Sequence, residues 1–326
     1  MGLMIGMDIG GTNIVCGLVD ESGKLLNKIK QSTEAHLGSG YVFDKISSMV
    51  DELLRAANVK HSEVTAIGVG TPGFIDPEKG ITVFASNLKW TQVPTAEEIR
   101  KRTGIPTFID NDVRMYVYGE AACGAAKGYE HVLGITIGTG LAAAMVNREQ
   151  LYYGSGYMAG ELGHIPFPEI PYECGCGLQG CLETVVSATG IARQAREQLA
   201  AGRDSIMRDW MEAKSINSIT AADVSKAYDA NDPLAIEIMN HTGTLLGKGL
   251  AAAVTLYSPE IIVIGGGAAL AGERLFAPMR EQLKKSVYSG YWDRLTISQA
   301  QMIDDAGIVG SAMAAGQRLL KTQTIE

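Results

Sequence analysis

Residues 3–19 read LMIGMDIGGTNIVCGLV, and this stretch decides the fold of the chain. Two apolar runs, 3–9 and 14–19, flank a tight turn made of Gly10, Gly11 and Thr12. Short apolar runs joined by a glycine turn are typical of paired strands. A third strand-like segment follows at 24–30, after the turn signal Ser22-Gly23. The opening of the chain is therefore predicted to be a β-meander.

Beyond residue 30, predicted helices and strands alternate. Apolar residues at helical spacing predict a helix over 41–57, and the segment 182–256 is mostly helical. Further strands are expected at 64–69, 106–109, 132–137, 141–146, 261–264 and 295–298, and further helices at 95–103, 113–123, 272–285 and 306–320. This alternation predicts an α/β protein.

Length and charge narrow the possible functions. The 326 residues suffice for two domains or one large one. A net charge of −8 without a Lys/Arg cluster argues against a nucleic-acid partner. No apolar run is long enough to span a membrane, and residues 1–8 lack the basic start of a signal peptide. We therefore expect a cytoplasmic protein that binds neither nucleic acid nor membrane.

Three glycine clusters follow apolar strands and could bind phosphate. Glycine turns expose backbone N–H groups at little steric cost, and such concavities suit phosphate oxygens. Each cluster alone is also typical of an ordinary turn, but together they fit one nucleotide held between two lobes. Asp8, just before the first cluster, could hold Mg²⁺ directly or through water. The clusters are Gly10, Gly11 and Thr12; Gly138, Thr139 and Gly140; and Gly265, Gly266 and Gly267.

Asp110, Asn111 and Asp112 follow the predicted strand 106–109. The carboxyl ends of strands are where α/β folds place their sites. Asp112 could take a proton from a substrate hydroxyl while Asn111 orients the substrate. Asn and Asp are also favoured helix caps, so capping is an alternative for members of this triplet.

The densest local signal is a group of three cysteines and a histidine. His164, Cys174, Cys176 and Cys181 offer the ligands of a tetrahedral Zn²⁺ site with no open position, which indicates a structural metal. A free thiol cluster or a redox site is the alternative. Glu161 and Glu183 flank the group. Either they are ordinary surface charges, or the zinc loop turns them towards a polyhydroxylated ligand.

These motifs together resemble the ROK family of sugar kinases, and within it the bacterial glucokinases. They occur in the order of the family over nearly the whole chain, and the GELGH and CGCG pair is the most specific of them. The matching stretches are DIGGT (8–12), Asn87-Leu88 before Trp90, DND (110–112), IGTG (137–140), GELGH (160–164), CGCGLQGCLE (174–183), IVIGGG (262–267) and DAGIVGSA (305–312).

The resemblance implies a two-lobed, actin-like ATPase fold of the ribonuclease H-like type, with a cleft between the lobes and a small zinc-binding loop. The N-terminal α/β lobe would span residues 1–120 and be joined by the last helix, about 304–326. The C-terminal lobe would span 121–303, with the zinc loop at 164–181. ATP and Mg²⁺ would be bound by Asp8 and the three glycine clusters, with Zn²⁺ as a structural ion.

The resemblance also implies a reaction: ATP-dependent phosphorylation of a hexose at its 6-hydroxyl, most simply glucose to glucose 6-phosphate. Asp112 would be the general base. The sugar would be held by Asn87, Asn111, Asp112, Glu161, His164 and Glu183, with His164 binding zinc through its other ring nitrogen. The family suggests a homodimer or a dimer of dimers.

Some residues depart from the pattern of the family and leave the hexose open. Large side chains, Val113 to Tyr116, follow Asp112 where small residues are common. Allose, fructose, mannose and N-acetylmannosamine are alternatives to glucose. The family also contains sugar-responsive repressors, which carry an N-terminal DNA-binding segment; the position of Asp8 and the acidic charge argue against one here. A non-catalytic sugar-binding protein is the last alternative, although Asp112, Thr12 and Thr139 are all present.

Overall fold

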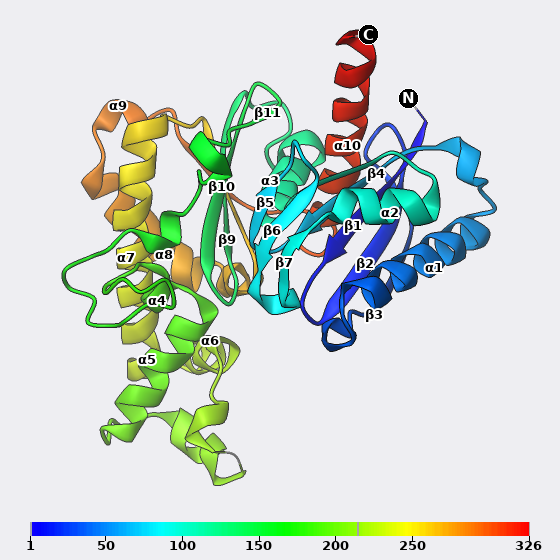
Figure 1. Cartoon of the computed structure of the whole chain (residues 1–326). Coiled ribbons are helices and arrows are strands. Elements are labelled where there is room, and N and C mark those ends of the chain that lie inside the picture. The colour runs from blue at the N-terminus through cyan, green and yellow to red at the C-terminus, as the bar shows by residue number, and fades with distance from the viewer. Residues whose placement is uncertain (1, 214, 326) are drawn as a thin grey trace. The chain divides into compact units, whose positions relative to one another are not determined.

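The computed structural model describes residues 2–213 and 215–325, and contacts divide them into two units (Figure 1). Unit 1 contains the described residues up to Val132, the segment Ala144–Ala159 and the residues from Ala300 onward; unit 2 contains Leu133–Ala143 and Gly160–Gln299. The chain holds two mixed five-stranded sheets together with helices, which confirms the predicted α/β class.

Unit 1 is built on the sheet β3-β2-β1-β4-β8. β1 pairs antiparallel with β2 and parallel with β4, so the predicted meander forms one side of the sheet. Its strands are β1 (Leu3–Ile9), β2 (Asn13–Val19), β3 (Leu25–Ser32), β4 (Val64–Thr71) and β8 (Thr107–Asn111), and its helices are α1 (Ser39–Ala57), α2 (Thr95–Thr103), α3 (Asp112–Cys123) and α10 (Ala306–Ile325).

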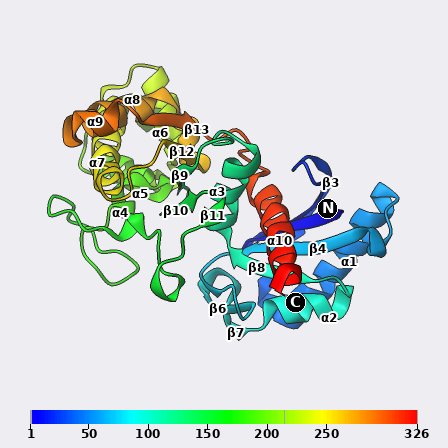
Figure 2. The same cartoon turned by 90° about the horizontal axis from the view of Figure 1, so that it is seen from above.

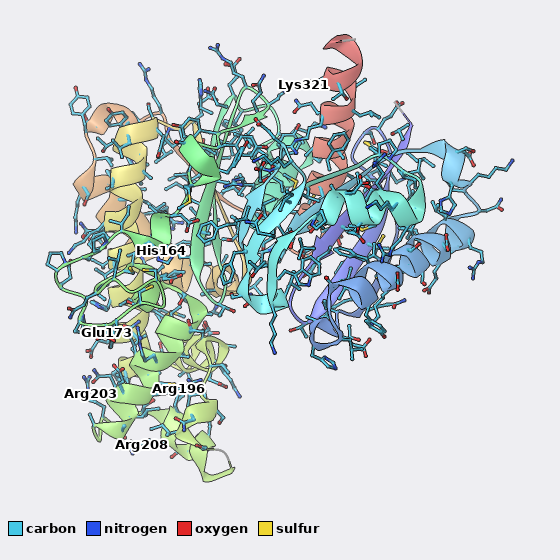
Figure 3. The ribbon with its side chains drawn as sticks, in the orientation of Figure 1. His164, Glu173, Arg196, Arg203, Arg208 and Lys321 are labelled. Carbon is cyan, nitrogen blue, oxygen red and sulfur yellow. The ribbon has the colours of Figure 1, made fainter. Side chains whose placement is uncertain are left out.

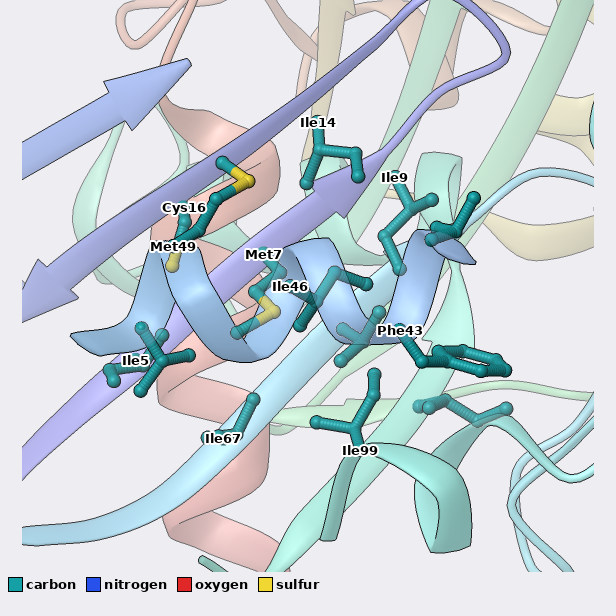
Figure 4. Close-up of a cluster of buried hydrophobic side chains, with 14 of the residues drawn as sticks. Ile5, Met7, Ile9, Ile14, Cys16, Phe43, Ile46, Met49, Ile67 and Ile99 are labelled. Atoms are coloured by element: carbon teal, nitrogen blue, oxygen red, sulfur yellow. The ribbon is translucent and has the colours of Figure 1, made fainter. Parts of the chain in front are cut away.

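Both faces of β1 are covered. Ile5, Met7 and Ile9 point to one face, where they pack with Phe43 and Ile46 of α1 in a fully buried cluster (Figure 4). Alternate residues of a strand point to opposite faces. Met4, Gly6 and Asp8 therefore face the other side, where Met4 packs with Ala312 of α10. The sheet thus brings Asp8 to the face covered by the last helix.

A row of glycines lets α10 approach this face closely (Figure 2). Gly6 of β1 lies beside Gly17 of β2 and Gly68 of β4 in the strand register. A Cβ atom on Gly6 would lie 1.7 Å from the Ile308 carbonyl oxygen, and one on Gly68 would lie 1.8 Å from that of Ser311. Real Cβ atoms do not approach backbone oxygens so closely, so only glycine fits at these two positions.

Unit 2 combines part of a second sheet with most of the remaining helices. The order of that sheet is β11-β10-β9-β12-β13. Its strands are β9 (His131–Ile137), β10 (Leu141–Asn147), β11 (Gln150–Leu151), β12 (Ile261–Gly265) and β13 (Thr296–Gln299). The chain crosses from unit 1 within β9 and back within β10. The helices are α4 (Glu183–Val186), α5 (Ala188–Ala200), α6 (Ala221–Asp229), α7 (Pro233–Tyr257), α8 (Glu273–Ser286) and α9 (Ser289–Trp292).

None of the helices in the described part of the chain combines the length and the apolar character needed to cross a membrane.

The structure adds elements that the sequence pattern did not predict. A three-stranded antiparallel sheet is formed by β5 (Phe74–Asp76), β6 (Ile81–Ala85) and β7 (Trp90–Val93). These strands are short, and the half-exposed Phe74 and Phe84 blur their alternation. In addition, β8 extends through Asn111 because Asp110 and Asn111 still pair with β4, whereas the predicted strand ended at residue 109.

The glycine row generates a stability prediction. Gly68→Ala should lower the free energy of unfolding by about 3 kcal/mol, because the new methyl group would meet backbone that has to move. Gly40→Ala in α1 is the control: no atom lies within 4 Å of the added carbon, so this change should be neutral or stabilise by about 0.5 kcal/mol. Urea unfolding of the three proteins measures both effects. Equal stability of Gly68→Ala and wild type would contradict close packing of α10.

Candidate active site

The turn between β1 and β2 carries the first group of predicted site residues. Gly10 donates its N–H to the Asn13 carbonyl at 2.9 Å, and its own carbonyl accepts the Thr33 hydroxyl at 2.6 Å. Asn87 packs against this turn, because a Cβ on Gly11 would lie 3.0 Å from the Asn87 carbonyl oxygen. The Thr12 and Asn87 side chains are exposed. The structure therefore brings Asn87 to the glycine turn, as a shared site requires.

Asn111 and Asp112 stand where β8 passes into α3. Asn111 is the N-cap of α3: its Oδ1 accepts from the backbone N–H groups of Val113 and Arg114 at 3.0 and 3.2 Å. Its Nδ2 donates to the Gly73 carbonyl at 3.2 Å. The capping alternative thus holds for Asn111. The Asp112 carboxylate accepts from the Val113 N–H at 2.9 Å and begins the helix.

Burial affects both Asp8 and Asp112, and the charge of Asp112 also acts on Asp8. Burial raises the pKa of Asp8 to about 7, and the negative charge of Asp112 adds to this shift. Burial also raises the pKa of Asp112, although the Val113 N–H and the Arg114 charge act in the opposite direction. Titratable groups shifted towards neutral pH are suited to proton transfer and to cation binding. Unit 1 therefore holds two carboxyl groups of this kind beside a glycine turn.

The predicted metal ligands come together in unit 2. His164, Cys174, Cys176 and Cys181 each offer a ligand atom, and these atoms lie within 4.8 Å of one another. His164, labelled in Figure 3, ends the short helical turn Leu162–His164, which precedes the three cysteines in the sequence. His164 Nδ1 lies 3.6 Å from Cys174 Sγ, and the Sγ atoms of Cys176 and Cys181 are 3.6 Å apart. The chain thus contains a His/Cys₃ cluster of the zinc type.

The spacing and chemistry of this cluster fit Zn²⁺. Zn–S bonds of about 2.3 Å and a Zn–N bond of about 2.0–2.1 Å give a tetrahedron whose edges are about 3.6–3.8 Å. The two 3.6 Å distances match such edges, and the other pairs of ligand atoms lie within 4.8 Å. Burial raises the pKa of the Cys174 thiol to about 12, so a cation would be needed to hold it as the thiolate that binds metal.

Two glutamates lie on either side of the His164 ring. Glu161 Oε2 is 3.7 Å from Nε2, and Glu183 Oε1 is 3.7 Å from Nδ1. Glu183 also accepts the Cys174 thiol at 3.1 Å and the Leu141 N–H at 3.3 Å. Since Nδ1 faces the cysteines, Nε2 and Glu161 remain on the other edge of the ring. That edge presents polar atoms to a ligand.

Unit 2 contains two glycine turns. One lies beside Glu183, and the other lies beside the end of β9. A Cβ on Gly140 would lie 2.7 Å from Glu183 Oε2, so glycine leaves room for this carboxylate. Gly266 has a φ of +85°, and a Cβ there would lie 2.6 Å from the Ile137 carbonyl oxygen. This contact places the turn after β12 against the end of β9. Gly138 and Gly267 have open space on the side where a Cβ would stand.

The predicted site residues are divided between the two units. Unit 1 holds Asp8, Gly10, Gly11, Thr12, Asn87, Asn111 and Asp112; unit 2 holds Gly138, Thr139, Gly140, Glu161, His164, Cys174, Cys176, Cys181, Glu183, Gly265, Gly266 and Gly267. Sequence reasoning missed the polar residues that surround Asp110, namely Arg114, Tyr153 and Arg318. Of these three, only Arg114 could have been noticed in the sequence, because it is one of the large residues that follow Asp112 and lies four positions after Asp110.

The raised pKa of Asp8 predicts how stability depends on pH. A folded-state pKa of about 7, above the usual value of 3.8, means that ionisation is penalised in the folded state. This contribution to stability is complete below about pH 4 and is lost as the pH rises through 7. Relative to Asp8→Asn, wild type should lose up to about 4 kcal/mol of unfolding free energy between pH 4 and 8.

Urea unfolding of wild type and Asp8→Asn across this pH range, in magnesium-free buffer, measures the difference. Taking the difference removes the titration of groups that do not interact with Asp8, and leaves that of Asp8 together with its coupling to Asp112. Asp51→Asn is the control for replacing a carboxyl group that is not buried. Asp51 is half-exposed on α1, where it pairs with His61 at 2.9 Å, so this change should not reproduce the loss of stability expected for Asp8. Parallel curves for wild type and Asp8→Asn would refute the raised pKa.

Comparison with known proteins shows which family and which proteins this chain is similar to. The model of the ROK family matches residues 4–318. The glucokinase of Thermotoga maritima is 34% identical over 320 residues, which cover 97% of this chain and 98% of that protein. The DNA-binding transcriptional repressor Mlc of Escherichia coli is 26% identical over 313 residues, which cover 95% of this chain and 74% of the repressor.

Solved structures agree with the sequence match. The crystal structure of a ROK family glucokinase from Streptomyces griseus, in complex with glucose and AMPPNP, superposes with a TM-score of 0.81 at 31% identity. The superposition covers 97% of this chain and 100% of that one. The resemblance inferred from the motifs is confirmed: the chain belongs to the ROK family and has its two-lobed, actin-like α/β fold.

Proposed function

We propose that this protein is a hexose kinase that transfers the γ-phosphoryl group of ATP to the 6-hydroxyl of glucose. The observation that carries the proposal is the pair of carboxyl groups in unit 1. Asp112 has a raised pKa at the start of α3, and Asp8 lies beside it at the glycine turn. The Thermotoga glucokinase and the Streptomyces glucokinase with bound glucose and AMPPNP support this choice of reaction.

In the proposed reaction Asp112 is the general base. Its carboxylate accepts the proton of the sugar hydroxyl, the hydroxyl oxygen forms a bond to the γ-phosphorus, and the bond from that phosphorus to the departing ADP oxygen breaks. Burial raises the pKa of Asp112, and this makes it a stronger base than an ordinary carboxylate. Asn111, fixed as the cap of α3, would orient the sugar together with Asn87.

Unit 2 would supply the remaining sugar and nucleotide contacts. Glu161, Glu183 and the Nε2 edge of His164 carry polar atoms that can bond sugar hydroxyls. The phosphates would be held by backbone N–H groups of Gly10, Gly11 and Thr12, of Gly138, Thr139 and Gly140, and of Gly265, Gly266 and Gly267. The cytoplasmic location and the dimer or dimer of dimers implied by the family stay predictions.

Two metal ions belong to the proposal. Mg²⁺, held through Asp8, would supply positive charge for the transferring phosphoryl group. Zn²⁺ on His164, Cys174, Cys176 and Cys181 would hold the loop that carries the sugar contacts. The buried Asp8 carboxyl fits a divalent cation, because such a charge would offset both its burial and the neighbouring Asp112.

The proposal predicts the effect of removing the base. Asp112→Asn should lower kcat for hexose phosphorylation by about 10²–10⁴-fold, because the amide cannot accept the proton. An ADP-release assay with Mg-ATP and glucose, mannose, fructose, allose or N-acetylmannosamine measures this and ranks the sugars. Asp51→Asn, on the outer face of α1, should keep full activity. Turnover of no sugar by the zinc-loaded wild type would reject the proposal and favour a sugar-binding protein without catalysis.

A second prediction concerns the metal. Cys176 is the exposed member of the cluster, so Cys176→Ala should fold but bind less zinc. Loss of the metal should raise KM for the sugar about tenfold or more while KM for ATP changes less. Metal analysis and steady-state kinetics measure the two effects, with Cys123→Ala as the control outside the cluster. Wild-type activity in zinc-free Cys176→Ala would remove the role of zinc in shaping the sugar loop.

A further inference from the structure

Asp110 is a buried carboxylate in β8, the strand that leads to the proposed base, and the proposed reaction does not use it. Asp110 precedes Asp112 by two residues, and it is only 2% exposed. Its Oδ1 accepts from Arg114 Nη1 at 3.0 Å and from the backbone N–H of Asn111 at 2.8 Å. Arg114 is itself only 7% exposed. An ion pair buried to this degree needs further polar partners to be tolerated.

Those partners come from two distant parts of unit 1. The Tyr153 hydroxyl, 43 residues away, donates to Asp110 Oδ2 at 2.7 Å. Arg318 of α10, 208 residues away, donates through Nη2 to the Tyr153 hydroxyl oxygen at 2.9 Å and to Asp110 Oδ2 at 3.4 Å. Burial raises the pKa of the Tyr153 phenol, so it remains a donor. Asp110, Arg114, Tyr153 and Arg318 are called the anchor cluster below.

The anchor cluster fixes the backbone on which Asn111 and Asp112 stand. Besides its side-chain contacts, Arg318 donates through Nη1 to the carbonyls of Ile109 at 3.3 Å and Pro77 at 3.2 Å. Ile109 is in β8, so one guanidinium binds both the main chain and the acidic side chain at the end of this strand. The end of β8 is thereby tied to α10 just before α3 begins.

The anchor cluster also contacts the segment that leads to Glu161, one of the proposed sugar-binding residues. Arg114 donates through Nη2 to the Tyr157 carbonyl, and its guanidinium lies 5.3 Å from the centroid of the Tyr153 ring. Tyr157 has a φ of +60°, a left-handed conformation that is costly for a tyrosine. Such conformations persist where the surroundings impose them. The chain continues from Tyr157 to Glu161 within four residues.

We infer that the anchor cluster is a positioning device, in which Tyr153 and Arg318 hold Asp110 so that Asp112 stands at the correct place for the reaction. The inference rests on the proposed role of Asp112 as base. Neither Tyr153 nor Arg318 is assigned a contact with substrate. Both act on Asp112 through Asp110, whose carboxylate they share.

Kinetics of Tyr153→Phe and Arg318→Met test the inference. Phenylalanine keeps the ring and removes only the donor to Asp110, and methionine keeps the aliphatic stem of Arg318. Each variant should lower kcat about ten- to hundredfold, because a displaced base reacts poorly. KM for ATP should stay within about twofold. The double variant should be no slower than the slower single one, because both side chains act through one carboxylate.

Matched variants separate positioning from loss of stability. Tyr152→Phe, at a neighbouring tyrosine that is 52% exposed, and Arg100→Met, on the surface of α2, should keep the kcat of wild type. Arg318→Lys should recover part of kcat, because an ammonium group still carries a donor and a charge. Folded variants with unchanged kcat, or kcat losses that simply add in the double variant, would overturn the inference.

A readout that needs no activity distinguishes this inference from the proposed function. Amide hydrogen exchange of the segment 109–114 should be at least tenfold faster in Tyr153→Phe than in wild type, because the end of β8 loses an anchor. If wild type phosphorylates no hexose, the proposed function fails, while the exchange result still shows whether the cluster holds this segment. Unchanged exchange would overturn the cluster itself.

Discussion

The close approach of α10 to the first sheet is the constraint on which unit 1 depends. Gly6 and Gly68 remove the side chains that would keep the helix away, so the backbone of α10 lies directly on β1 and β4. On its other side, Gly310 meets the Met115 carbonyl of α3, where a Cβ would lie only 1.8 Å from the oxygen. One helix therefore sets the position of both the sheet and α3, and with them Asp8 and Asp112.

With the proposed zinc bound, the His/Cys₃ cluster would have a comparable organising role in unit 2. Residues 174–181, which carry the three cysteines, contain one large apolar side chain, Leu178, and both Leu178 and Cys176 are exposed. Hydrophobic burial alone gives such a loop little order. Glu183 links the cluster to the start of β10 through the Leu141 N–H, and to the turn at Gly140 by contact. Binding of the proposed zinc would therefore also affect the positions of Glu183, the start of β10 and the turn at Gly140.

The sequence was sufficient to predict helices and metal ligands that are marked by patterns among nearby residues. The helix over 95–103 agrees with α2, and the four metal ligands meet as their spacing implied. The partners of Asp110 could not be found in this way, because Tyr153 and Arg318 have no local pattern and reach it only through the fold. The strands β5 to β7 were missed because their pairing is settled by contacts between short segments rather than by alternation. Roles of single residues towards sugar and nucleotide remain predictions.

The position of α10 after unit 2 in the sequence also has a consequence for biosynthesis. A chain leaves the ribosome from its N-terminus, so β1 and β4 are made long before the helix that covers their second face. All of unit 2 is synthesised in between. Met4 and Val19, which pack against Ala312, stay open to water or to chaperones until about 300 further residues have been added. Unit 1 is therefore completed only after unit 2 has been synthesised, although the first strands of unit 1 precede unit 2 in the sequence.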